Sequence, residues 1–180
     1  MDIIETTCPD VLLLQPRVFE DERGFFMETF RQSFFDDLGL NVQFVQENYS
    51  ASERGVLRGL HYQLQKPQGK LVRVTVGEVY DVAVDLRQNS PTFSQHVGVR
   101  LSAENKQQLW VPPGFAHGFL VLSERAEFSY RCTEYYHPED ERAIVWNDSH
   151  LAIDWPDCGE KILSKKDSAA PAFSNAALYP

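Results

Sequence analysis

The sequence predicts an all-β protein built as a sandwich or barrel of short strands. Short runs rich in β-branched and aromatic residues recur along the chain, and Gly, Pro, Asn or Asp turns separate them at close intervals. Only Ser33–Leu38, with Gly39 as a C-cap, has the pattern of a convincing helix. The 180 residues fit one domain, residues 1–180, and no repeat or linker divides them.

The expected strands follow one another from near the N-terminus to residue 136. Turn signals such as Asp21-Glu-Arg-Gly24 and Lys66-Pro-Gln-Gly69 bound them. The last residues, about 150–180, show no strong period, and we expect them to pack on the domain as a C-terminal tail. The expected strands are Val11–Leu14, Phe25–Phe30, Phe44–Ser50, Gly55–Gln63, Lys70–Val76, Val79–Leu86, Val97–Leu101, Leu109–Val111, Phe115–Leu122 and Glu127–Tyr136.

Charge and cysteine content indicate which kinds of partner and which cellular compartment to expect. A net charge of −9 and a pI near 5.0 argue against a nucleic-acid or acidic-membrane partner, but they allow a small anionic ligand in a local basic pocket. No apolar run approaches the length of a membrane span, and the N-terminus lacks the features of a signal peptide. The three cysteines have no CxxC spacing, which favours a reducing compartment. We therefore expect a cytoplasmic protein.

The stretch Gly55–Gln63 places Arg58, His61 and Gln63 in an otherwise apolar strand. Alternate side chains of a strand share a face, so His61 and Gln63 point the same way. Arg58 would face away in a regular strand, unless a bulge at Gly59 turns both Arg58 and His61 inward. Such a segment either binds a ligand or holds a hydrogen-bonded core histidine beside an edge arginine.

Two spacings resemble the half-motifs of the cupin family. Gly55 and His61 fit G-x5-H, and Pro112–His117 fits P-x-G-x-x-H. The resemblance implies a cupin-type double-stranded jelly roll with a few short helices, whose cavity opens between the sheets. In that family three histidines and a glutamate bind a divalent metal.

Here the metal ligands are largely replaced. Gln63 stands for the second histidine, Val121 for the late ligand and Lys70 for the glutamate. A lysine would repel a dication but can itself stabilise an oxyanion. We therefore expect no metal and no other cofactor at this site.

A pocket that holds a histidine and a lysine without a metal suits removal of a C–H proton beside a carbonyl. A neutral histidine can accept the proton, and a lysine cation can stabilise the enolate oxygen. A tyrosine, neutral at rest, can return a proton from the opposite face. The outcome is inversion of a carbon, an epimerisation.

At the level of whole blocks, the chain resembles the dTDP-4-dehydrorhamnose 3,5-epimerase family from about Val11 to Ala177. The resemblance implies a metal-free isomerase that inverts C3 and C5 of dTDP-4-dehydro-6-deoxy-D-glucose to give dTDP-4-dehydro-L-rhamnose. It also implies a homodimer that exchanges an N-terminal strand. The matching blocks are Phe19–Phe26, Phe44–Asn48, Val56–Gln63, Gln68–Arg73, Val76–Asp85, Ser90–Phe93, Leu101–Lys106, Gly114–Phe119, Trp146–Asp148 and Leu163–Asp167.

The same resemblance assigns roles to individual residues. His61 would be the base, Asp167 its carboxylate partner, Tyr130 the proton donor and Lys70 the enolate stabiliser. Without it, Asp167 reads as a loop residue and Tyr130 as a half-buried strand aromatic. Phe26 or Tyr136 could stack on thymine. The residues implied to bind substrate are Arg23, Glu28, Gln46, Glu47, Asn48, Arg58, Lys70, His117, Glu141 and Lys166.

Three other functions stay open at this point. A single-carbon epimerase on a related dTDP-4-keto sugar would keep the same histidine, lysine and aspartate and differ around the tyrosine. A metal-dependent cupin such as a dioxygenase would need a metal. A non-catalytic cupin would bind the nucleotide sugar without exchanging its carbon-bound protons.

Overall fold

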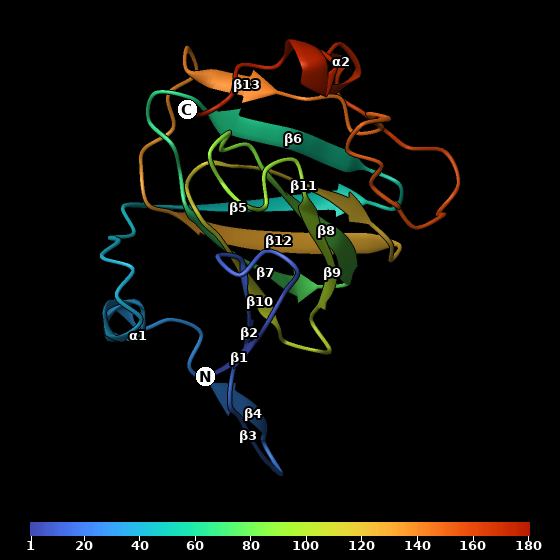
Figure 1. The fold of residues 1–180 in the computed structure, drawn as a ribbon. Coiled ribbons are helices and arrows are strands. Elements are labelled where there is room, and N and C mark those ends of the chain that lie inside the picture. Colours follow the sequence, from blue (N-terminus) through green and yellow to red (C-terminus); the bar gives the residue numbers. More distant parts are fainter.

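The computed structural model describes residues 1–180 as two facing β-sheets with a small hairpin set apart from them (Figure 1). This confirms the predicted all-β class. One sheet has the order β1 (Asp2–Ile4), β2 (Leu12–Gln15), β10 (Gln108–Val111), β7 (Lys70–Val76), β12 (Arg125–Cys132) and β5 (Gln46–Glu53). The other has the order β13 (Glu141–Ala143), β6 (Leu57–Gln63), β11 (Phe115–Val121), β8 (Glu78–Asp85) and β9 (His96–Ser102).

The main core lies between the two sheets and explains the alternating pattern of their strands. Val72 and Phe128 of the six-stranded sheet belong to one buried cluster with Val79 and Phe119 of the five-stranded sheet. The rings of Phe119 and Phe128 stack with centroids 4.2 Å apart. Side chains that alternate along each strand therefore bury one face against the facing sheet.

The outer face of the five-stranded sheet is covered by the end of the chain. Leu60 and Val82 on that face cluster with Ile144, Leu151 and Phe173. As a result every residue of β11 is buried, and that strand is apolar nearly throughout instead of alternating. The covering segment contains α2 (Lys165–Ser168) and a 3-10 turn at Phe173–Asn175.

The N-terminal part differs most from the sequence prediction. The expected strand Phe25–Phe30 is instead half of a hairpin, β3 (Val18–Asp21) paired with β4 (Gly24–Met27), which projects from the body of the chain (Figure 1). Phe25 and Phe26 are 58% and 71% exposed, although the Lys106 ammonium group lies over the Phe25 ring.

The bounds of the other elements differ less from those that the sequence predicts. The predicted helix is present as α1 (Gln32–Asp37), and its Phe35 packs on Trp110. The strand expected at Phe44–Ser50 is shifted toward the C-terminus and spans Gln46–Glu53, and the strand expected at Glu127–Tyr136 is shorter and spans Arg125–Cys132. No helix in the chain has the length and apolar character needed to cross a membrane.

Candidate active site

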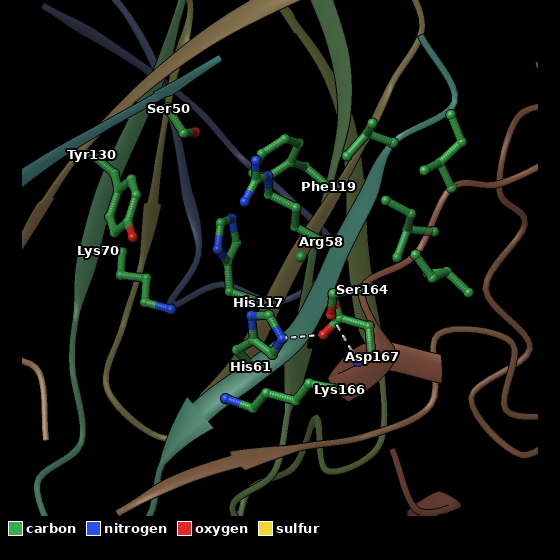
Figure 2. Close-up of a pocket in the computed structure, with 15 residues that line it drawn as sticks. Ser50, Arg58, His61, Lys70, His117, Phe119, Tyr130, Ser164, Lys166 and Asp167 are labelled. Carbon is green, nitrogen blue, oxygen red and sulfur yellow. Dashed lines mark hydrogen bonds and ion pairs between the residues drawn. The ribbon is translucent and has the colours of Figure 1, made fainter. Parts of the chain in front are cut away.

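A cavity of about 400 Å³ opens between the two sheets, and most of the predicted site residues line it (Figure 2). Both sheets and the C-terminal tail contribute to its wall. Arg58, His61 and His117 come from the five-stranded sheet, and Lys70 and Tyr130 from the six-stranded sheet. The tail adds Lys166 and Asp167 from α2.

The predicted bulge in β6 is confirmed, and it brings Arg58 and His61 to the same cavity. His117 pairs with His61 and Phe119 with Arg58, so β6 has one residue more than β11 over this interval. Gly59 lies in the bulge with φ +128°, where a Cβ would come within 2.5 Å of the Gly118 Cα. The two strands approach so closely here that neither Gly59 nor Gly118 has room for a Cβ.

His61 is oriented by a buried carboxylate from the tail. Its Nε2 lies 2.5 Å from Asp167 Oδ1, and only 4% of the Asp167 side chain is exposed. The other ring nitrogen of His61 points to the side of the cavity where Lys70 and Tyr130 lie (Figure 2). The pair leaves this nitrogen available to accept a proton while the carboxylate faces the opposite edge of the ring.

The first turn of α2 holds Asp167 in place. Ser164 is the N-cap residue, and its side-chain oxygen accepts a hydrogen bond from the Asp167 N–H at 3.0 Å. Burial pushes the pKa of Asp167 up, but the hydrogen bond and charge of His61, with Ser164 and Lys166, outweigh burial and lower it. Asp167 is therefore an anion at neutral pH.

Tyr130 and Lys70 face the cavity from the sheet opposite His61. Burial raises the pKa of Tyr130, so its phenol keeps its proton at neutral pH. Burial lowers the pKa of Lys70, while negative charge at Asp81 and Glu141 opposes this shift. The cavity thus holds the protonated Tyr130 phenol and the Lys70 amino group close to each other on one wall (Figure 2).

Asp81 is a functional candidate that the sequence analysis missed. It is fully buried in β8, and both of its carboxylate oxygens lie within hydrogen-bond distance of His117 Nε2, at 2.9 and 3.1 Å. A carboxylate inside the apolar run Val79–Leu86 was the available signal, because buried acidic groups are rare unless they are paired.

A second cavity of about 300 Å³ adjoins the first and shares His61, Lys70 and Tyr130 with it. Gln46, Asn48 and Glu141, all expected to bind substrate, line this second cavity together with Tyr136. The Tyr136 hydroxyl donates to Glu141 Oε2 at 2.6 Å, and Lys166 Nζ forms an ion pair with the same oxygen. The hydrogen bond to Glu141, with burial, raises the pKa of Tyr136 to about 12.

Three of the expected binding residues do not reach either cavity in the single chain. Glu47 alternates with Gln46 and Asn48 along β5, and its carboxylate instead contacts Ser129 and Arg131. Arg23, at the tip of the hairpin, pairs with Asp21, and Glu28 pairs with Arg31. Their predicted role in substrate binding stays a prediction.

The pocket residues do not fit the metal set of the cupin family. The Gln63 amide is bonded to backbone groups of Lys66, Tyr135 and His137, and Lys70 occupies the glutamate position. No group of three or more His, Cys, Asp or Glu side chains in the chain has an arrangement that could hold a metal ion.

The jelly-roll sandwich and its cavity are those of a cupin-like isomerase. Comparison with known proteins identifies the family within that class. The family model for dTDP-4-dehydrorhamnose 3,5-epimerase matches residues 5–175. A protein of that name from Pseudomonas aeruginosa is 61% identical over 100% of both chains, and one from Salmonella typhimurium is 58% identical over 99% of this chain and 98% of its own. The chain belongs to the dTDP-4-dehydrorhamnose 3,5-epimerase family.

Solved structures agree with this assignment. A Legionella pneumophila dTDP-6-deoxy-D-glucose-3,5-epimerase, crystallised with dTDP-4-keto-L-rhamnose, superposes with a TM-score of 0.95 at 54% identity and covers 98% of this chain and 94% of its own. A 3'-monoepimerase from Streptomyces bikiniensis, solved with dTDP-quinovose, gives a TM-score of 0.88 at 34% identity and covers 94% and 87%. The fold is therefore shared by double and single epimerases.

Proposed function

We propose that the chain inverts C3 and C5 of dTDP-4-dehydro-6-deoxy-D-glucose and so forms dTDP-4-dehydro-L-rhamnose. The observation that carries this proposal is the placement of the base and the acid in opposite sheets. His61 enters the cavity from β6, and Tyr130 enters it from β12 (Figure 2). A sugar ring between the sheets would meet the two groups on its two faces, which is what inversion of a carbon requires.

Each inversion begins with proton removal. The free ring nitrogen of His61 takes the proton from the carbon next to the C4 carbonyl, and the electron pair of the C–H bond moves through that carbon to the carbonyl oxygen. Asp167 stabilises the imidazolium that forms. The Lys70 ammonium group stabilises the enolate oxygen, and the Arg58 guanidinium group adds a donor near it, while His117 lines the same cavity with its Nε2 bonded to Asp81.

Re-protonation completes the inversion. The Tyr130 hydroxyl gives its proton to the carbon from the opposite face, and the electron pair of the enolate reforms the carbonyl. Tyr130 then recovers a proton from solvent, and His61 releases the one it took. Because C3 and C5 both flank the C4 carbonyl, the same groups serve both carbons after a shift of the sugar.

The nucleotide end occupies the second cavity in this proposal. Gln46, Asn48 and Glu141 would contact the nucleotide, Lys166 would face the diphosphate, and the exposed ring of Tyr136 would stack on thymine. The location of the two cavities supports this arrangement, since they adjoin at His61, Lys70 and Tyr130.

We also propose a homodimer in which the β3–β4 hairpin of one subunit completes the cavity of the other. The exposed rings of Phe25 and Phe26 leave an apolar surface without a partner in the single chain. Arg23 and Glu28 flank this surface, and exchange of the hairpin would carry both to the partner's cavity. The three unpaired cysteines support activity in a reducing compartment such as the cytoplasm.

The test is incubation of the purified protein with dTDP-4-dehydro-6-deoxy-D-glucose in heavy water, with deuterium followed at C3 and C5 by NMR and mass spectrometry. We expect deuterium at both carbons and the L-rhamno product. The His61→Ala variant should incorporate none. The Tyr130→Phe variant should retain exchange on the His61 side but lose inversion by about 100-fold, because only delivery of the second proton is removed.

The similarity to a 3'-monoepimerase keeps a single-carbon reaction as the second candidate. Deuterium at one carbon alone would establish that reaction and refute double inversion. No deuterium with the nucleotide sugar bound would refute epimerisation altogether and leave a binding protein.

A further inference from the structure

The loop between β12 and β13 carries Tyr136 at the rim of the second cavity. Residues 133–140 lie outside the strands of both sheets. Tyr136 is 49% exposed, so packing in the core does not fix its position. A segment of this kind holds one conformation only if other groups satisfy its backbone donors and acceptors.

The side-chain amide of Gln63 supplies two of these partners. Its Nε2 donates to the Tyr135 carbonyl oxygen at 3.1 Å, and its Oε1 accepts from the His137 N–H at 2.8 Å. These two groups belong to the peptide bonds immediately before and after Tyr136. Nε2 also donates to the Lys66 carbonyl oxygen at 2.8 Å, and Gln63 is only 3% exposed. Both amide hydrogens are therefore used on backbone groups.

Gln46 holds the same peptide bond from the opposite sheet. Its Oε1 accepts from the Tyr136 N–H at 3.0 Å, and its own Nε2 donates to Asn48. The peptide bond before Tyr136 is thus fixed at both ends, at its carbonyl by Gln63 of β6 and at its N–H by Gln46 of β5. The two strands belong to different sheets (Figure 1).

We infer that Gln63 is a positioning residue for nucleotide binding, which fixes the Tyr136 backbone so that its ring stands at the rim of the second cavity. The inference rests on the proposed function, which places the nucleotide in that cavity. Gln63 occupies the position of a metal-binding histidine in the cupin motif. A primary amide suits its role here because it offers two donors and one acceptor in a single plane, which neither a histidine nor a carboxylate does.

Two substitutions of Gln63 distinguish a role in hydrogen bonding from a role in filling space. Gln63→Met keeps the length of the side chain and loses all three hydrogen bonds. We expect dTDP affinity to fall about tenfold, because the Tyr136 backbone is no longer held at the rim of the second cavity. The KM should rise by a similar factor while kcat stays within about twofold. Gln63→Glu places a carboxylate against two carbonyl oxygens, so its dTDP affinity should improve as the pH falls and the carboxyl gains a donor proton.

A double-mutant cycle on the full chain decides whether Gln63 acts through Tyr136. Titration calorimetry with dTDP should show that Gln63→Met changes affinity by less than about twofold once Tyr136→Ala is present. Gln107→Met is the matched control, because Gln107 gives up a bond to Gln15 remote from both cavities and should bind dTDP normally. Circular dichroism and thermal melting check that each variant is folded.

Additive effects of the two substitutions, or unchanged dTDP affinity in folded Gln63→Met, would overturn the inference. These outcomes are independent of catalysis. A wild-type protein that binds dTDP but exchanges no deuterium into its substrate would refute the proposed reaction alone. A wild-type protein that binds no dTDP would refute the positioning role as well.

Discussion

His117 and Asp81 form a second imidazole–carboxylate pair in the wall of the cavity, with His117 Nε2 at 2.9 and 3.1 Å from the two carboxylate oxygens. In the register of β6 and β11, His117 lies directly opposite His61. Two imidazoles thus stand side by side, and each is held by a carboxylate that lies behind it. In the proposed reaction the His61 pair transfers the proton, and the His117 pair adds a second imidazole to the cavity wall.

Replacing Asp81 should reveal its effect on Lys70. The negative charge of Asp81 opposes the lowering of the Lys70 pKa by burial, so Asp81→Asn should lower that pKa further. The alkaline limb of the kcat profile should therefore move to lower pH, and kcat at neutral pH should fall about tenfold. A pH–rate profile measures both. Asp85→Asn is the control, because Asp85 is equally buried in β8 but pairs with Arg87.

An alkaline limb that stays in place in Asp81→Asn would show that Asp81 does not set the pKa of Lys70. If the Asp85→Asn control moved the alkaline limb to the same extent, the shift would result from the loss of a buried charge in general and would not be specific to Asp81.

The Asp167 carboxylate should matter for turnover more than for binding. Asp167→Asn removes the charge that stabilises the His61 imidazolium and permits the wrong ring tautomer, so kcat should fall by about 1,000-fold to 10,000-fold with KM little changed. Steady-state kinetics give the two constants. Asp157→Asn, an exposed aspartate in the same tail, should leave both at their wild-type values. A fall of less than tenfold in kcat would show that Asp167 does not support His61 as the base.

Much of the site could be predicted because its residues lie in strands with a clear local pattern. The glycine between Arg58 and His61 predicted a bulge, and the β6–β11 register shows one. Lys70 and His117 could be placed near His61 from the spacing of the cupin half-motifs. These inferences need only local geometry, since strand alternation and a glycine bulge decide where a side chain points.

Contacts between distant segments could not be read from local pattern. Asp167 meets His61 across 106 positions of the chain, from a tail with no periodicity, and only the resemblance to the family connected them. Asp81 was hidden in an apolar strand, because its partner comes from another strand of the sheet. The hairpin was read as one strand, since aromatic residues such as Phe25 and Phe26 predict burial whether or not the chain itself can bury them.

Acid should destabilise the fold through Asp85. Burial alone would raise the pKa of Asp85, but hydrogen bonds from Arg87, Ser90 and Thr92 outweigh burial and lower it to about 2. A lowered carboxyl pKa gives stability that is present above the unfolded value of 3.8 and is lost as the pH falls toward 2. The contribution at neutral pH is roughly 2 kcal/mol.

Urea unfolding of wild type and Asp85→Asn between pH 7 and pH 2 measures this contribution. The difference in free energy of unfolding should be constant above about pH 5 and shrink below about pH 4. A difference that did not change with pH would mean that the variant loses packing instead of charge.

Exchange of the hairpin between subunits makes the activity of a mixture diagnostic. If Arg23 serves the partner's cavity, Arg23→Ala and His61→Ala impair groups that meet in one site only across the dimer. A hybrid dimer then has one site with both defects and one site with neither. Random exchange makes half of the dimers hybrids, so the mixture should recover about a quarter of wild-type activity.

Subunits would be exchanged by mild denaturation and refolding, with each variant treated alone as the control. Size-exclusion chromatography with light scattering establishes that a dimer is present. Mixing His61→Ala with Tyr130→Phe should give no recovery, because both residues belong to the same subunit's cavity, and every site of a hybrid keeps one defect. Recovery in that second mixture, or none in the first, would show that the hairpin does not complete the partner's site.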